Sequence, residues 1–118
     1  MMIIRSLKTK QSILHALADE EMIKILDCAL FGTKSVSDVI RDCRIPHTTA
    51  YRKIKWLIDE GLLTIEKIEI TEDGKKYSLF RSALKSVSIK YEYSNMVVEA
   101  EPNVEIVEKL TERFLSLD

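Results

Sequence analysis

SVSDVIRDCRIPHTTAYRKIKWLIDEGLL, residues 35–63, carries the signals for two short helices joined by a tight turn. Ser35 and Asp38 have the spacing of a capping box, in which each side chain bonds the other residue's backbone N–H. Pro46 disfavours the α conformation at Ile45 and therefore ends the first helix. Pro46 also suits the first position of a second helix, where its missing N–H costs nothing.

The second helix, residues 46–60, is predicted to have one apolar and one polar face. The apolar face follows helical spacing through Ala50, Ile54, Leu57 and Ile58. The polar face holds His47, Thr48, Thr49, Tyr51, Arg52 and Lys55. Gly61 suits a left-handed cap that ends the helix. This pattern predicts a helix-turn-helix whose second helix enters the major groove of DNA, where such side chains bind base edges or phosphates. The alternative is an ordinary solvated polar face.

Residues 62–82 predict a β-hairpin directly after this helix. LLTIEKIEI and KYSLFRS are rich in apolar and β-branched residues, and Asp73-Gly74 between them is a strong hairpin turn. A hairpin in this place is a wing, which lies along the DNA backbone or minor groove. Lys75 and Lys76 at its tip are predicted to contact phosphates, with Arg81 assisting nearer the base. Lysines that only solubilise an exposed turn are equally compatible with the pattern.

The charge distribution supports this interpretation, although the whole chain has a formal net charge of only −1. Residues 34–55 hold six basic residues against two acidic ones, a local charge of +4. Residues 92–118 hold seven acidic residues against two basic ones, a local charge of −5. A basic patch opposite an acidic pole gives the local field that phosphate contact requires.

The flanking segments predict further elements. Residues 1–18, with Ile3 and Ile4 among their apolar positions, predict a first helix. Asp19 is expected to cap a second helix, which has too broad an apolar band for a surface helix and is expected to end at Gly32. Residues 85–101 predict a second hairpin with a turn at Ser94-Asn95. This hairpin is expected to serve sheet packing or a subunit contact, or to bind a ligand through its tyrosines.

Pro102 is expected to open a last helix, whose apolar side chains follow 3-3-4-3 spacing. They are Val104, Val107, Leu110, Phe114 and Leu117. Burying them is worth about 1.5–3 kcal/mol each, so they are expected to cover the first helix, the same helix of a second subunit, or both. The chain of 118 residues is thus expected to be one domain, 1–118, with a DNA-binding core at 19–82. Residues 1–18 and 83–118 are expected to serve dimerisation or accessory roles.

Several classes of protein are disfavoured. No apolar run approaches the roughly 20 residues of a membrane helix, and the N-terminus lacks a signal peptide's apolar region, so a cytoplasmic protein without membrane contact is expected. Cys28 and Cys43, with two histidines, have no metal-ligand spacing, which predicts no metal and no cofactor. Reduced, buried cysteines are the simpler interpretation, and a redox switch or a metal site is the alternative. No nucleophile elbow or phosphate-binding Gly loop suggests an enzyme.

Residues 35–63 resemble the core of winged helix-turn-helix transcription regulators, with the proline, T-x-Y-R and G-L-L at matching spacing. The chain is most similar to the arsenical-resistance-repressor-like (ArsR-like) group and to archaeal regulators, which also have a second β segment and a terminal helix like KYSLFRSALKSVSIKYE onward. The resemblance implies a mainly α fold with a β-wing (α+β) and a homodimer that binds double-stranded DNA. The metal-sensing branch has a Cys-x-Cys pair where this chain has only Cys43, so the resemblance does not extend to metal sensing.

The leading hypothesis is therefore a sequence-specific, dimeric transcriptional regulator. Its DNA contacts are expected from His47, Thr48, Thr49, Tyr51, Arg52, Lys55, Lys75 and Lys76. The alternative is a winged-helix module that binds proteins of the transcription machinery. A small-molecule effector could bind between the second hairpin and the last helix, but no residue pattern identifies its chemistry.

Overall fold

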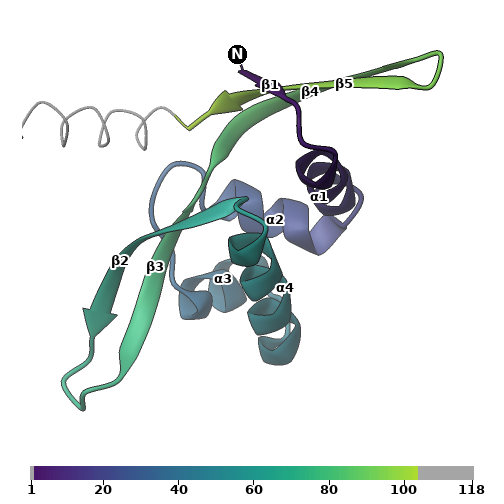
Figure 1. The fold of residues 1–118 in the computed structure, drawn as a ribbon. Helices are drawn as coiled ribbons and strands as arrows, with labels where there is room; N and C mark the ends of the chain where they lie inside the picture. The colour runs from purple at the N-terminus through teal and green to yellow at the C-terminus, as the bar shows by residue number, and fades with distance from the viewer. Residues whose placement is uncertain (1, 104–118) are drawn as a thin grey trace, which may run out of the picture.

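The computed structural model describes residues 2–103, which form an α+β winged helix-turn-helix (Figure 1). Two hairpins project in different directions from a cluster of helices (Figure 1). The helices are α1 (Leu7–Leu17), α2 (Glu20–Cys28), α3 (Val36–Cys43) and α4 (His47–Asp59). The strands are β1 (Met2–Ile4), β2 (Leu63–Ile70), β3 (Lys76–Ser82), β4 (Leu84–Glu92) and β5 (Asn95–Pro102). The predicted fold class is confirmed.

The predicted capping box begins α3. The Ser35 hydroxyl accepts from the Asp38 N–H at 3.2 Å, and the Asp38 carboxylate accepts from the Ser35 N–H at 2.9 Å. The helix ends at Arg44, which is left-handed with φ 54°. Pro46 then acts as the N-cap of α4, one position before the place that its spacing predicts.

The end of α4 is a Schellman motif around Gly61, which has φ 78°. The Leu62 N–H donates to the Leu57 carbonyl at 2.9 Å, and the Gly61 N–H donates to the Ile58 carbonyl at 3.0 Å. Leu57 and Leu62 are both buried, which supplies the apolar contact that accompanies this motif. The turn directs the chain straight into β2, so the predicted wing follows α4 without a linker.

The wing is the antiparallel pair β2–β3, with Gly74 at φ 84° in its turn. Lys34, just before α3, pairs with Phe80 through two backbone hydrogen bonds of 2.9 Å. This bridge ties the base of the wing to the helix-turn-helix. A bulge between Ile65 and Lys67 interrupts the register of β2.

The N-terminal prediction needs a correction, because a strand precedes the helix. Ile3 and Ile4 belong to β1, which pairs with Val98–Ala100 of β5, and α1 starts only after the Ser6 cap. The three-stranded sheet has the order β1-β5-β4. Pairing with a strand about 95 residues away could not be read from local helical spacing.

The second hairpin is confirmed, but its turn is one residue earlier than predicted. Tyr93 and Ser94 have φ values of 49° and 63°, so they form the turn between β4 and β5. Tyr91 and Tyr93 are 73% and 94% exposed. This end of the hairpin extends beyond the helices that could cover it (Figure 1).

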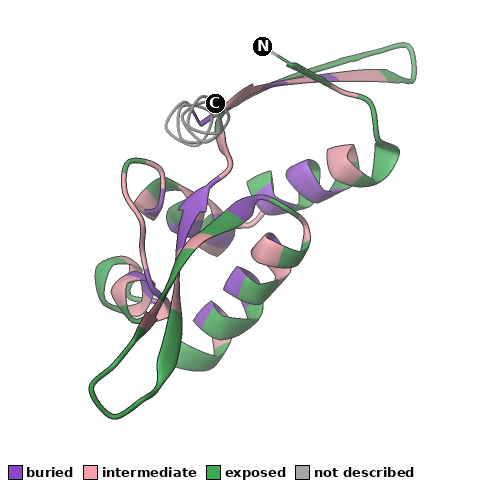
Figure 2. Ribbon diagram, turned by 60° about the vertical axis from the view of Figure 1, so that its left-hand side comes forward, coloured by how far each residue is buried: buried purple, intermediate pink, exposed green. Residues whose placement is uncertain are grey.

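The main core lies where the helices meet the base of the wing (Figure 2). Its largest fully buried apolar side chains are Phe80, Ile13, Ile25, Leu57, Leu63, Val39 and Val98. The cap of α2 by Asp19 is confirmed. The helix nevertheless ends at Cys28 and not near Gly32, because the end of β3 bonds its last turn. The Ser82 N–H donates to the Ala29 carbonyl at 2.9 Å, and the Ser82 hydroxyl donates to the Leu26 carbonyl at 2.5 Å.

The predicted last helix lies outside the described residues. Among residues 2–103 there is no helix with the length and apolarity needed to cross a membrane.

Candidate nucleic-acid interface

The side chains of α4 that are predicted to contact DNA lie on its outer side. His47, Thr48, Tyr51, Arg52 and Lys55 are exposed, and Thr49 is half-buried. The opposite side of α4 is buried in the core through Ala50, Ile54 and Leu57 (Figure 2). The N-terminal half of the helix therefore presents polar and cationic groups to an approaching ligand.

The rings of His47 and Tyr51 lie against each other one helical turn apart. Their centroids are 4.6 Å apart and their planes are inclined at 45°. This contact restricts the Tyr51 side chain while leaving it 51% exposed. A partly fixed phenol on the outer face is suited to a polar contact with a groove or a phosphate.

A groove of about 1040 Å³ separates α3 and α4 from the wing. Tyr51 and Lys55 line its helix side, and Lys75 and Lys76 line its wing side. The fold thus brings together four of the eight predicted contact residues. His47, Thr48, Thr49 and Arg52 lie on the leading turns of α4 and do not line this groove.

Some cations around this surface form ion pairs with nearby carboxylates, and others do not. Arg41 pairs with Asp42 at 2.9 Å and with Asp38 at 3.2 Å, and its hydrogen bond holds the pKa of the Asp42 carboxyl below its usual range. Lys55 pairs with Asp59 at 3.1 Å, in an exposed contact that contributes little to stability. Within residues 2–103, Arg52, Lys75 and Lys76 form no ion pair, so they are among the cations that a phosphate can approach at least cost.

Lys53 does not belong to the basic patch that the charge count of residues 34–55 predicted. Its side chain is 11% exposed, and its ammonium lies 2.7 Å from Asp19 and 2.8 Å from Glu21. These two hydrogen bonds raise the pKa of Lys53. Lys53 therefore holds α4 against the start of α2 and adds no charge to the outer face.

Arg81 is also unsuited to the contact that its sequence position suggested. It is buried at the base of the wing and lies 2.9 Å from the Glu66 carboxylate, which is itself nearly buried. Glu66 occupies the bulge of β2, where the extra residue faces the interior. The expectation of a DNA contact by Arg81 was wrong, because Arg81 is buried against Glu66 at the bulge. Such a bulge cannot be foreseen from the alternation of residues along a strand.

Arg44 is a candidate that the sequence reasoning missed. It lies in the turn between α3 and α4, is exposed, and forms no ion pair with the described residues. Its left-handed backbone is unusual for a residue with a side chain. The signal was a basic residue two positions before Pro46, in the turn that leads from α3 into α4.

No group of three or more metal-ligating side chains occurs among residues 2–103. Cys28 and Cys43 are free thiols, both half-buried, on α2 and α3. Burial, together with the neighbouring Cys43, raises the pKa of Cys28 to about 11. A raised pKa lowers the thiolate fraction and hence the reactivity of this residue.

Comparison with solved structures gives a likeness at low sequence identity. The chain is similar to NolR from Sinorhizobium fredii, with 13% identity, 96% of this chain and 97% of that chain covered, and a TM-score of 0.44. A likeness at this level carries no information about function. No protein-family model and no curated protein matches the sequence.

Proposed function

We propose that this protein is a transcriptional regulator that binds double-stranded DNA sequence-specifically as a homodimer. In this function α4 enters the major groove, and the wing lies along the backbone or minor groove. One observation carries the proposal: Tyr51 and Lys55 on the exposed side of α4 line the same wide groove as the lysines of the wing tip, while the opposite side of α4 is buried. The residues proposed to contact DNA are His47, Thr48, Thr49, Tyr51, Arg52, Lys55, Lys75 and Lys76.

Within this proposal the contacts have different tasks. Arg52 lies on the leading half of α4 without an ion pair to another described residue, so its guanidinium is available for a bidentate bond to guanine or a phosphate. Lys75 and Lys76 on the wing provide phosphate contacts that position the helix without reading sequence. The proposal assigns the protein no catalytic step, no metal and no cofactor.

The proposal of a homodimer is supported by apolar side chains that the described chain leaves in solvent. Leu7 and Leu14 of α1 are 64% and 37% exposed and lie two turns apart on the helix. An exposed apolar patch of this kind is typical of a protein contact. A two-fold dimer also presents two recognition helices to two half-sites, which increases affinity for a palindromic site.

A second candidate is a winged-helix module that docks on another protein. The observation in its favour is the wing itself, on which Ile65, Ile68 and Ile70 are 42%, 60% and 64% exposed. Lys67 of the wing is also paired with Glu69 at 2.6 Å. Isoleucines on an exposed strand suit a protein surface better than a phosphate backbone.

The proposal is tested by selecting bound duplexes from a random pool and measuring the mass of the free protein and of the complex. The expected result is a palindromic consensus bound by two chains. Arg52→Ala should weaken binding to that consensus by about 1–3 kcal/mol. Lys90→Ala, a lysine on the distant β4–β5 hairpin, is the matched control and should bind like the wild type. No enriched sequence, together with duplex binding that Arg52→Ala leaves unchanged, would refute the proposal.

A further inference from the structure

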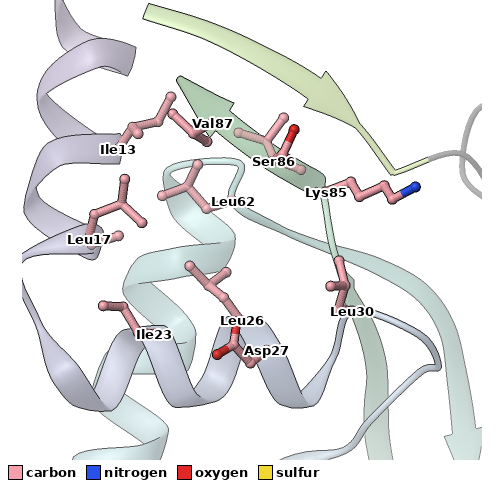
Figure 3. A pocket seen from close by; sticks show the side chains of 12 residues that line it. Ile13, Leu17, Ile23, Leu26, Asp27, Leu30, Leu62, Lys85, Ser86 and Val87 are labelled. Carbon is pink, nitrogen blue, oxygen red and sulfur yellow. The ribbon is translucent and has the colours of Figure 1, made fainter. Parts of the chain in front are cut away.

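The two faces of the β4–β5 hairpin differ in chemistry. Between Ser86 and Glu92 the pairing with β5 is regular, so alternate residues of β4 share a face. The apolar face holds Val87, Ile89 and Tyr91 of β4, with Ala100, Val98 and Met96 of β5 opposite them. Val87 lies beside Ile13 of α1, so this is the face that turns toward the helices (Figure 3). The opposite face carries the ion pair of Lys90 with Glu92.

The apolar face loses its cover toward the turn of the hairpin. Val87 is half-buried, whereas Ile89 is 37% exposed and Tyr91 is 73% exposed. The outer end of the hairpin, residues 89–97, forms an arm that extends past α1 (Figure 1). Residues 2–103 thus leave most of Tyr91 uncovered, although the apolar face of a sheet is ordinarily buried against another element.

Helix α1 has a matching uncovered surface. Ser12, Ile13 and Ala16 on its inner side are buried. Leu7 and Leu14 lie two helical turns apart on the outer side and are 64% and 37% exposed. Leucines at helical spacing that face away from the core are typical of a contact with another apolar element.

The arm leaves these leucines exposed in its own chain, and its position there is fixed. Val98 and Ala100 at the base of the hairpin are fully buried. The Lys10 ammonium of α1 donates to the Met96 carbonyl at 2.9 Å, which holds β5 beside the helix. A second copy can cover both surfaces at once, because a two-fold axis places each arm on the α1 of the other chain and forms the same contact twice.

The area of this surface is suited to such a contact. A tyrosine side chain buries ~150–250 Å² when it is covered, so Tyr91 and Tyr93, which are 73% and 94% exposed, offer roughly 300 Å². Leu7, Leu14 and Ile89 add to this area. A standard interface buries about 800 Å² on each partner. Each chain brings both an arm and an α1 to the contact, so these five side chains supply a substantial part of that area.

We propose that the arm packs across α1 of a second copy, with Ile89 and Tyr91 against the stripe formed by Leu7 and Leu14, and that the second arm makes the same contact in return. This inference rests on the homodimer of the proposed function and names the surface by which its two chains meet. The face that carries Lys90 and Glu92 stays in solvent.

The first test is the mass of the free full-length protein by sedimentation equilibrium. Ile89→Ser combined with Tyr91→Ser should weaken the dimer at least ~100-fold, because each lost contact occurs twice at a two-fold interface. The matched control, Lys90→Ser combined with Glu92→Ser, changes the neighbouring residues on the opposite face and should dimerise like the wild type. Circular dichroism verifies that each variant is folded. A monomeric wild type would overturn the proposal and leave this surface to a different partner.

Disulfide trapping locates the contact without weakening the dimer. Chains in which Cys28 and Cys43 are replaced by alanine carry either Leu14→Cys or Tyr91→Cys and are refolded together, so a disulfide that joins positions 14 and 91 must link two chains. This disulfide should form at least ~10-fold faster than the one between Leu14→Cys chains and Lys90→Cys chains. Equal rates for the two mixtures would overturn the proposal.

Binding to a random-sequence duplex separates a failure of this inference from a failure of the proposed function. The variant with serine at positions 89 and 91 should still bind the duplex with a negative salt slope, because α4 and the wing are unchanged. Duplex binding by a dimer whose mass these two changes do not alter would overturn the arm contact and leave DNA binding standing. A dimer that requires Ile89 and Tyr91 but binds no duplex would contradict DNA binding and leave the arm contact standing.

Discussion

Lys53 of α4 donates to both carboxylate oxygens of Asp19, at 2.9 Å and 2.7 Å, and Asp19 is the residue that caps α2. The same carboxylate accepts the Met22 N–H at 3.0 Å. One acidic side chain therefore starts α2 and fixes α4 against it. This relationship distinguishes the two sides of α4, because its inner lysine holds the fold together whereas Arg52 and Lys55 lie exposed on the outer side.

Lys53→Met should lower the free energy of unfolding by about 1–3 kcal/mol, because it leaves two carboxylates beside an apolar side chain. Lys55→Met, two positions along the same helix, is the matched control. Its partner Asp59 is exposed, so stability should not change, while DNA affinity should fall. Urea unfolding and duplex titration check both variants. Equal stability of Lys53→Met and wild type would contradict the structural role of Lys53.

The capping box of α3 makes stability depend on pH in the acidic range. The Ser35 N–H holds the pKa of Asp38 below its usual value against the opposing effect of burial, and Arg41 adds to the lowering. A carboxyl whose pKa is lower in the folded chain than in the unfolded chain stabilises the fold above its unfolded value of 3.8. This stabilisation should be lost as the pH falls below that value.

Urea unfolding between about pH 7 and about pH 3 measures this dependence. Asp38→Asn should lower stability at neutral pH. Its stability should also decrease less than that of the wild type as the pH falls. Asp19→Asn should act in the same direction. For Asp19 burial raises the pKa, but the hydrogen bonds from Lys53 and from the backbone N–H of Met22 outweigh this effect, so the pKa of Asp19 is lowered overall. If the stability of a variant changed with pH in parallel with that of the wild type, its replaced capping residue would be excluded as a source of the pH dependence.

Arg44 provides a test in which stability and binding should change differently. Its left-handed backbone costs a residue with a Cβ about 1 kcal/mol, which glycine avoids, although glycine gains entropy in the unfolded chain. Arg44→Gly should therefore be as stable as the wild type or slightly more stable, and Arg44→Ala should be no more stable than it. Both should lose the same DNA affinity if the guanidinium contacts a phosphate, and the salt slope should fall by about one. Full affinity in either variant would show that Arg44 makes no contact.

Cys28 should be unreactive in the folded protein at neutral pH. Its pKa of about 11 leaves little thiolate, so alkylation by iodoacetamide should be at least ~10-fold slower than in urea-unfolded chain. Mass spectrometry of the peptide that contains Cys28 measures both rates. Rapid modification of the folded chain would favour the redox role that the sequence left open.

The sequence predicted the features that arise from local chemistry. Ser35 and Asp38, Asp19, Gly61 and Asp73-Gly74 each define a helix end or a turn through their own side chains or backbone freedom, and each is confirmed. The outer and inner faces of α4 followed from the 3.6-residue period.

The features that could not be predicted depend on distant residues. Ile3 and Ile4 join a strand because β5 is available to pair with them, and Lys53 is buried because Asp19 and Glu21 lie opposite it. Arg81 faces inward because a bulge brings Glu66 to it. In each case the local sequence was also compatible with the structure that was predicted. A contact with a residue distant in the sequence determined the structure that forms.

The most direct measurement of the central claim is the affinity for a random-sequence duplex as a function of salt concentration. The exposed cations near α4 and on the wing, including Arg52, Lys75 and Lys76, should release counterions from about three or more phosphates. The logarithm of the binding constant should then fall linearly with the logarithm of salt concentration, with a slope of about −0.9 for each phosphate. Binding that is absent at low salt, or present with a slope near zero, would contradict the assignment of this surface to DNA.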